Sequence, residues 1–428
     1  NRMGKSRSAR WLPTWNLSGA WNAHEESWFE KLKPVLSNFT AKLSYSLTAD
    51  RGPSSITNSR AVIKADNPWR PSASDKESSL YIAWLANQDL TYEKKHELNF
   101  GIDAGFLNNR INFTFDIYTR RNYDLIGATN TMGIGGESTK YGNVAKMKSN
   151  GVELSLNTVN IKTKDFTWST DFIYSHMHNE VTELNTYNRL YDYISGYGFT
   201  MPGYPQRSLF SIPFAGLNNE GLPTFYDPDG NITVTGIDMQ EYDPERLKFL
   251  KYEGPADPTD VGSFGNIFRY KNLTLNLFIT YSFGNVVRLD PVFSSRYSDL
   301  SATPKEFNNR WIKPGDEKYT NIPVIASKQQ LNNIADLDRA YQSYNYSTAR
   351  VAKGDFIRMK EISLAYEFPK TITQALNIAN LSLKLQATNL FLLYADKKLN
   401  GQDPEFFNAG GVATPMPKQF TLTLKFGI

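Results

Sequence analysis

The last stretch of the chain carries the pattern that most limits how the whole sequence can fold. From Phe420 onward every second residue is apolar, and the residues between are polar or glycine. Successive side chains of an extended strand point to opposite faces, so this period of two gives one apolar and one polar face. A tilted strand of about nine to eleven residues can cross the hydrocarbon of a bilayer. The apolar residues are Phe420, Leu422, Leu424, Phe426 and Ile428.

The same alternation recurs upstream, so it describes an architecture rather than a single strand. Two runs, Leu98–Ala104 and Ile111–Ile117, flank an Asn-Asn turn and predict an antiparallel hairpin. Counting back from Ile428 gives eleven strands in all. The other nine are expected at Trp15–Trp21, Phe39–Leu47, Val152–Leu156, Phe166–Tyr174, Phe264–Tyr270, Leu273–Phe283, Ile362–Phe368, Leu381–Ala387 and Phe420–Ile428.

The connections between these strands alternate between short and long. Barrels of the outer membrane have short periplasmic turns and long extracellular loops, and the alternation fits that arrangement. A weaker apolar run at Leu80–Trp84 is expected inside an outer loop, because counting it as a crossing would put the long segment 50–78 on the short-turn side. The short connections are 107–110, 160–165 and 271–272, and the long ones are 121–150, 176–261, 284–355 and 392–417.

Composition supports an all-β chain. Hydrophobic residues make up 40%, the mean hydropathy is −0.47, and no stretch approaches eighteen consecutive apolar residues, so a helical membrane protein is excluded. Aromatic residues reach 14%, which suits strands. A net charge of +4 indicates no nucleic-acid partner. The start at Asn1 shows no signal peptide, so we expect a removed export signal or the later part of a longer chain.

Several strands carry aromatic residues near their ends. Such rings prefer the membrane–water interface, where they form girdles around a barrel. The alternative is that they are ordinary core residues. The residues are Trp15, Trp21, Trp168, Tyr174, Tyr281, Phe283, Tyr366 and Phe368.

Short motifs recur in order over residues 97–428: Glu97–Asp103, Asn109–Tyr118, Asp124–Ile126, Asn150–Leu154, Asp165–Trp168, Gly262–Asn266, Trp311–Asp316, Lys353–Leu364, Thr388–Phe391, Asp403–Glu405 and Pro415–Leu422. Together these motifs resemble the C-terminal half of a SusC/RagA-type TonB-dependent transporter. The resemblance implies a transmembrane antiparallel β-barrel of 22 strands in the outer membrane of Bacteroidota, plugged by an N-terminal domain. Residues 1–428 would then be the C-terminal half of that barrel, without the plug and the N-terminal strands.

The resemblance also implies partners and an activity. A SusD-like lipoprotein would form a lid on the outer loops, TonB would supply energy through the missing N-terminal part, and transporter–lid pairs could form dimers. The substrates would be oligosaccharides or oligopeptides. Two other functions stay open: a passive porin-like channel, and a secreted β-rich adhesive protein.

Physical chemistry adds a constraint of its own. An open sheet of eleven strands has two edges with unpaired N–H and C=O groups. Each unpaired group in lipid costs several kcal/mol, so two such edges would cost on the order of tens of kcal/mol. We therefore expect another polypeptide segment to supply the remaining strands, with outer-membrane lipid around the completed wall.

Candidate binding residues are tyrosines in the long loops, since aromatic rings stack on sugars and on peptide side chains. Neighbouring Arg189 and Asp192 could fix polar groups. Three interpretations stay open for these tyrosines: substrate contact, lid contact and loop packing. The residues are Tyr187, Tyr191, Tyr193, Tyr197, Tyr204, Tyr341, Tyr344 and Tyr346.

Other chemistry is not indicated. Asp227–Asn231 with Asp238 is superficially like a calcium loop, but it lacks glycine at the sixth position and glutamate at the twelfth, so we expect a plain Asp-Gly turn. His176 and His178 share a strand face without a third metal ligand. No catalytic constellation stands out, and we expect neither an enzyme nor a cofactor.

Overall fold

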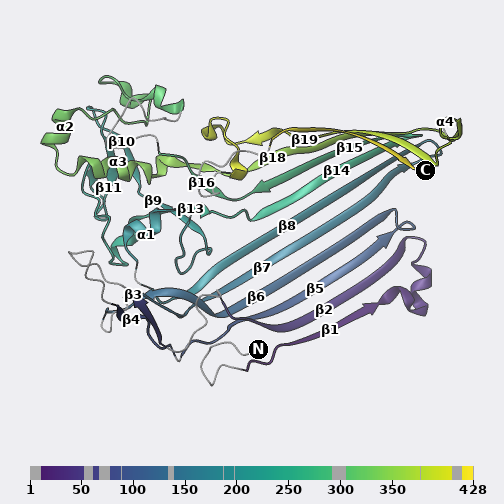
Figure 1. Ribbon diagram of the computed structural model, residues 1–428, viewed down its shortest axis with the longest axis horizontal. Coiled ribbons are helices and arrows are strands. Elements are labelled where there is room, and N and C mark those ends of the chain that lie inside the picture. The colour runs from purple at the N-terminus through teal and green to yellow at the C-terminus, as the bar shows by residue number, and fades with distance from the viewer. Residues whose placement is uncertain are drawn as a thin grey trace.

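The computed structural model describes residues 11–52, 61–66, 78–87, 89–133, 139–186, 188–196, 198–291, 305–375, 377–406 and 417–427. Its main element is one antiparallel sheet of eleven strands, ordered as they occur in the chain (Figure 1). The eleven predicted strands are confirmed. They are β1 (Trp15–Asn22), β2 (Leu36–Asp50), β5 (Glu93–Phe106), β6 (Ile111–Asn130), β7 (Thr139–Lys162), β8 (Phe166–Leu184), β14 (Asp260–Tyr270), β15 (Leu273–Phe283), β18 (Phe356–Glu367), β19 (Asn380–Ala395) and β20 (Gln419–Gly427).

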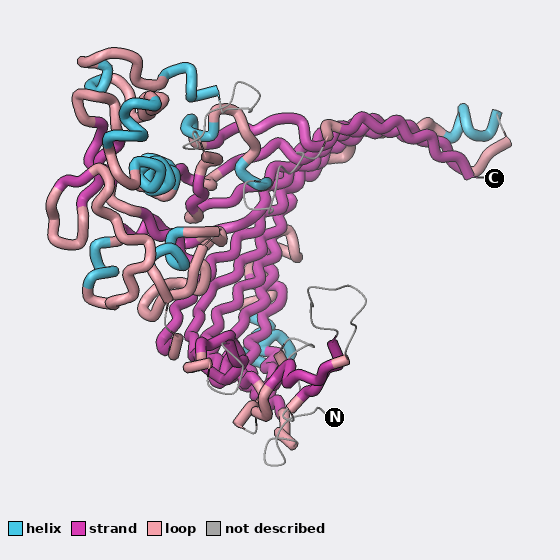
Figure 2. Tube along the Cα trace, turned by 60° about the vertical axis from the view of Figure 1, so that its left-hand side comes forward, coloured by secondary structure: helices cyan, strands magenta, loops and turns pink. Residues whose placement is uncertain are grey.

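The sheet is curved but open. Figure 2 shows it bending from the C-terminal strands round to the N-terminal strands without closing. Within the described residues, β1 pairs only with β2 and β20 only with β19. Both outer strands therefore present one free edge, as expected for part of a larger wall.

The register places the apolar residues of all strands on one face. Leu277 of β15 lies opposite Ile362, which lies opposite Ala387, which in turn lies opposite Phe420 of β20. This face has no protein layer against it in the described structure, since Phe420 is 77% and Leu422 65% exposed. An apolar surface of this extent requires an apolar medium. The adjacent row of cross-strand partners points to the opposite face and is polar. It consists of Asn276, Ser363, Gln386 and Thr421.

Two strands reach much further than their alternation indicated. The predicted long connection at 121–150 is wrong, because β6 continues to Asn130 and β7 begins at Thr139. The ladder simply carries on through polar pairs such as Arg121 opposite Lys148. Backbone hydrogen bonds hold this part together, and its sequence no longer alternates regularly between apolar and polar residues.

The tight turns lie at one end of the sheet and the long loops at the other (Figure 1). Positive φ angles at Leu107, Asn108, Asn109 and Lys271 form the tightest turns. The connection from β1 to β2 contains two 3-10 helices, η1 (Ala23–Glu25) and η2 (Ser27–Lys31), and α4 (Lys370–Ala375) links β18 to β19. No helix in the described ranges is long and apolar enough to cross a membrane.

At the loop end, β3 (Val62–Asp66) and β4 (Ser79–Trp84) form a separate hairpin, so the run at Leu80–Trp84 lies inside an outer loop as predicted. Residues 185–259 and 305–350 fold together into a unit that we call the cap. Its elements are α1 (Leu190–Ile194), β9 (Ser208–Ser211), β10 (Phe214–Leu217), β11 (Pro223–Tyr226), β12 (Ile232–Thr233), η4 (Arg246–Phe249), β13 (Lys251–Pro255), η5 (Lys305–Asn309), η6 (Asp316–Lys318), α2 (Lys328–Asn333), α3 (Leu337–Asn345) and η7 (Thr348–Arg350).

The cap has its own hydrophobic core, drawn from both loops. Phe210 and Phe225 of the first loop pack in one cluster with Tyr341 and Tyr344 of the second. The backbone of Ile212 bridges the loops, since its N–H donates to Tyr346 and its carbonyl accepts from Thr348. Between cap and sheet lie β16 (Val286–Arg288) and β17 (Val351–Lys353), and the mouth also holds η8 (Lys397–Leu399) and η9 (Pro404–Phe406).

Candidate functional site

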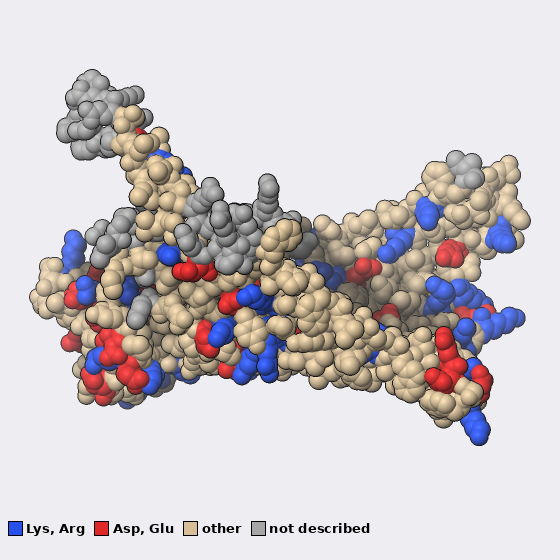
Figure 3. All heavy atoms as spheres, turned by 90° about the horizontal axis from the view of Figure 1, so that it is seen from below, with Lys and Arg blue, Asp and Glu red and all other residues tan. Residues whose placement is uncertain are grey.

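The polar face of the sheet lines a hollow that carries charges of both signs. Figure 3 shows acidic and basic side chains gathered between the two arms of the sheet. One cluster centres on Glu97, which lies 2.8 Å from Lys95 and 2.9 Å from Arg120. Another ion pair joins Lys42 and Asp103 at 2.7 Å. Such partly exposed pairs stabilise little, but they make this face hydrophilic, as a water-filled lumen requires.

A buried arginine attaches one outer segment to the wall. Arg358 of β18 is only 5% exposed and lies 2.5 Å from Asp403 and 3.2 Å from Glu405. Both carboxylates belong to the segment with η8 and η9. Because a buried charge is costly without its partner, this cluster fixes the segment over the luminal face.

Two further arginines are buried beside the cap. Arg350 lies 2.6 Å from Glu306 within the cap, and it also donates to the carbonyl of Asp290 outside the cap. Arg288 donates to the Phe210 carbonyl at 2.5 Å and to the Ser211 hydroxyl at 3.3 Å. Burial lowers the pKa of Arg288 to about 10. The guanidinium therefore stays charged at neutral pH and keeps its role as an anchor.

The predicted tyrosines do not form one surface. Tyr193, Tyr341 and Tyr344 are buried in the cap core, and this burial favours packing among the three interpretations. Burial raises the pKa of Tyr344 to about 12, and Tyr341 donates its hydroxyl to the carbonyl of Val324 at 2.8 Å. The remaining five divide into two groups: Tyr191, Tyr204 and Tyr346 are partly buried against the core, and Tyr187 and Tyr197 lie outside the described residues.

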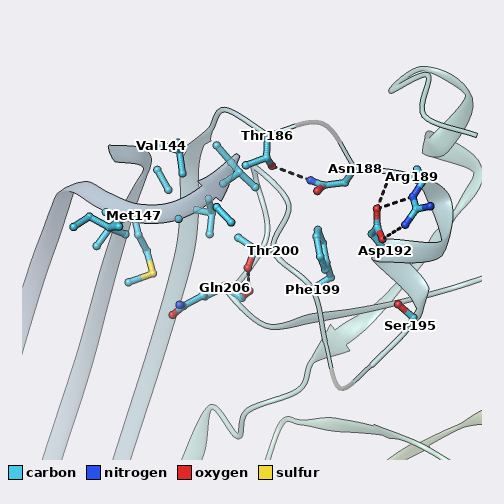
Figure 4. A pocket seen from close by; sticks show the side chains of 17 residues that line it. Val144, Met147, Thr186, Asn188, Arg189, Asp192, Ser195, Phe199, Thr200 and Gln206 are labelled. Atoms are coloured by element: carbon cyan, nitrogen blue, oxygen red, sulfur yellow. Dashed lines mark hydrogen bonds and ion pairs between the residues drawn. The ribbon is translucent and has the colours of Figure 1, made fainter. Parts of the chain in front are cut away.

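A cleft that the sequence did not indicate lies between the outer ends of β6–β8 and the cap. Its volume is about 710 Å³. The strands contribute Leu125, Met147 and Leu184, while the cap contributes Phe199 and Gln206 (Figure 4). Met147 lies on the same face of β7 as the luminal Ser149 and Glu153, so the cleft opens on the luminal face. Only Arg189 and Asp192 on its rim had been singled out from the sequence.

Arg189 and Asp192 are committed to each other. The Asp192 carboxylate accepts from the Arg189 backbone N–H at 2.9 Å and from its guanidinium at 3.1 Å, which caps α1. Burial opposes ionisation of Asp192, but the hydrogen bonds from Arg189 outweigh it and lower the pKa of the carboxyl. Arg189 also donates to Gln240 at 2.9 Å. Both side chains therefore have a structural role at the rim of the cleft.

The Asp227–Asn231 motif and His176, which we did not expect to bind a metal, have structural roles. Asp227 accepts from the backbone N–H groups of Asp229 and Asn231, which makes the turn. His176 lies 2.9 Å from Asp260, which also accepts from the hydroxyl of a neighbouring tyrosine. The described residues contain no group of three or more His, Asp or Glu side chains placed to hold a metal.

Comparison with known proteins gives consistent matches. No family model matches the chain. TonB-dependent receptor P3 of Formosa agariphila is 25% identical over 409 residues, covering 90% of this chain and 37% of the receptor. TonB-dependent receptor SusC of Bacteroides thetaiotaomicron is 26% identical over 437 residues, covering 98% of this chain and 40% of SusC. The solved structure of the RagAB peptide importer in its open-open state matches with a TM-score of 0.76 at 22% identity, covering 100% of this chain and 44% of that chain.

The sheet has the fold of part of an outer-membrane β-barrel, and the chain is similar in sequence to TonB-dependent receptors, a class that is not enzymatic. The similarity is to receptors of the SusC/RagA type, and the eleven-stranded sheet corresponds to part of the receptor barrel. The resemblance drawn from the strand motifs is thereby confirmed. The chain spans less than half the length of the relatives that it matches, 37% of P3 and 40% of SusC.

Proposed function

We propose that residues 1–428 form the C-terminal half of the barrel of a TonB-dependent importer in the outer membrane. The observation that carries this proposal is the open sheet with an apolar outer face and a charged inner face. Its free edges at β1 and β20 would be paired by N-terminal strands outside this chain. The N-terminal part would also supply the plug and the contact with TonB. That pairing removes the edge cost that an isolated half would face in lipid.

The cap would take part in substrate capture. It lies at the loop end of the sheet, and a hydrophilic hollow continues from it along the luminal face (Figures 1 and 3). A lid closing over the cap would trap an oligosaccharide or an oligopeptide, and TonB would then act on the plug to open the lumen. RagAB is described as a peptide importer, which supports a peptide substrate here.

A SusD-like lipoprotein would dock on the cap through exposed apolar side chains. Ile312 is 67% and Tyr319 88% exposed, and both belong to the second cap loop. Large exposed apolar and aromatic residues are typical of protein interfaces. Replacing them by Ile312→Asp and Tyr319→Glu should weaken co-purification of the lipoprotein with the intact transporter.

Val35 provides the matched control. It is 63% exposed but lies at the tight-turn end, between η2 and β2, so a surface lipoprotein cannot reach it. Val35→Asp should therefore leave the complex intact. Equal recovery of the lipoprotein with all three variants would contradict the docking surface.

Energy coupling is tested separately. Uptake of a labelled oligopeptide or oligosaccharide by cells that carry the intact transporter should cease when TonB is deleted. Uptake that continues at the same rate without TonB would instead identify a passive porin-like channel.

A further inference from the structure

We infer that the cleft between β6–β8 and the cap binds a large apolar side chain of a peptide, an inference that rests on the import function proposed above. The cleft lies where the cap meets the luminal face, so a molecule held between lid and barrel can reach it. Its volume of about 710 Å³ is within the range of ligand pockets in proteins.

The strand side of the cleft is aliphatic. Leu125, Met147 and Leu184 are partly exposed there, and Val144 and Val181, which also line the cleft, are buried. None of these side chains offers a hydrogen-bond donor or a strong acceptor. Methionine adapts its shape to different apolar partners, which suits a site for side chains of varied form.

The cap side carries neutral polar groups beside the paired Arg189 and Asp192. Ser195, Thr200 and Gln206 face the same space, and Figure 4 shows Met147 extending toward Gln206. Thr200 already donates to the carbonyl of Gln206, whereas the side-chain amide of Gln206 makes no hydrogen bond with the described part of the chain. An amide that can donate and accept matches the peptide group of a bound segment.

The charged residues at the rim do not define the ligand. Arg189 and Asp192 form an ion pair with each other, so neither residue offers an unpaired charge to an ionic ligand. The selectivity must then come from the aliphatic side.

A sugar fits this surface poorly. A pyranose ring would place several hydroxyl groups against the aliphatic side, and they would lose hydrogen bonds to water without replacement. Phe199 is the aromatic ring in the lining, and it packs edge-on against Tyr193 with 5.0 Å between ring centroids. An aliphatic or aromatic side chain loses no hydrogen bonds there.

The test measures binding of three probes to the intact transporter in detergent. The probes are a fluorescently labelled hexapeptide of glycine and serine, the same hexapeptide with one central leucine, and labelled maltohexaose. Burial of a leucine side chain should strengthen binding about 10- to 100-fold over the serine peptide. The Met147→Gln variant should remove most of this difference.

Met177→Gln is the matched control, because Met177 also lies on the luminal face of β8 but does not line the cleft. It should retain the full preference for leucine. Equal binding of the leucine and serine peptides to the unaltered transporter would overturn the inference, as would maltohexaose binding as tightly as the leucine peptide. So would an equal loss of the preference in both methionine variants.

Binding and import are separable. If the transporter imports peptides in a TonB-dependent way without preferring leucine, the cleft assignment fails and the proposed function stands. If it prefers leucine in binding but imports nothing when TonB is present, the proposed function fails.

Discussion

The assignment of faces predicts that two adjacent residues of β15 respond oppositely to the same substitution. Leu277 points to the apolar face, with Asn266 and Ile362 as cross-strand neighbours. Asn276 points to the lumen and donates to the Glu361 carboxylate at 3.3 Å. Arginine at position 277 would meet lipid, whereas arginine at position 276 would meet water and the Glu361 carboxylate.

The depth of Leu277 sets the magnitude. A tilted strand rises about 2.5 Å per residue along the barrel axis, so Leu277 lies about 10 Å from Leu273 and about 15 Å from Phe283. These two residues mark the ends of an apolar band that is about 25 Å tall in barrels of this kind, which puts Leu277 near its middle. Arginine at that depth costs about 2–4 kcal/mol, a factor of about 30 to 1000 in the folding equilibrium.

The assay is urea titration of the intact transporter refolded into phosphatidylcholine vesicles, followed by heat-modifiable migration on a gel. Leu277→Arg should lower the unfolding free energy by the amount above, whereas Asn276→Arg should change it by about 1 kcal/mol or less. Losses of similar size at both positions, or a larger loss at position 276, would refute the assignment of lipid and lumen.

Three further outcomes are expected. Arg358→Met leaves the largely buried Asp403 carboxylate without its ion pair at a local cost of about 3–5 kcal/mol, so hydrogen exchange in the segment carrying η8 and η9 should rise sharply; unchanged exchange would contradict the anchor. The pKa of Asp192 is lowered through Arg189, so its stabilisation of α1 is complete above the unfolded pKa of about 3.9 and is lost as pH falls through the folded value; exchange in α1 should show this, and Asp192→Asn should abolish it. Gly262→Ala adds a methyl group against the Ile173 carbonyl oxygen and the hydroxyl end of Tyr281, and we expect a loss of about 1–3 kcal/mol in urea titration, with no loss arguing against this close packing.

The wall could be predicted from sequence because its strands alternate between apolar and polar residues with a period of two. A slip of one residue would exchange the lipid and luminal faces, so the apolar residues of each strand fix its register. The limits of this signal are visible in β6 and β7, where Arg121 faces Lys148 beyond the membrane band and the alternation disappears while the ladder continues.

The cap and the cleft could not be predicted in the same way. The cap core joins residues far apart in the chain, such as Phe210 and Tyr341, from elements of two to nine residues that show no periodicity. The tyrosines were noticed for their chemistry, but a loop rich in tyrosine has the same composition whether its rings are buried or exposed. Only the packing of the two loops separates Tyr344 in the core from Tyr319 on the surface.

The shared core of the cap has a consequence for the order of assembly. One loop connects β8 to β14 and the other connects β15 to β18, and Ile212 of the first is held between Tyr346 and Thr348 of the second. The apolar residues of each loop are buried against the other, and bringing the loops together before the strands align carries an additional loop-closure cost. We therefore expect the cap core to form after the wall beneath it.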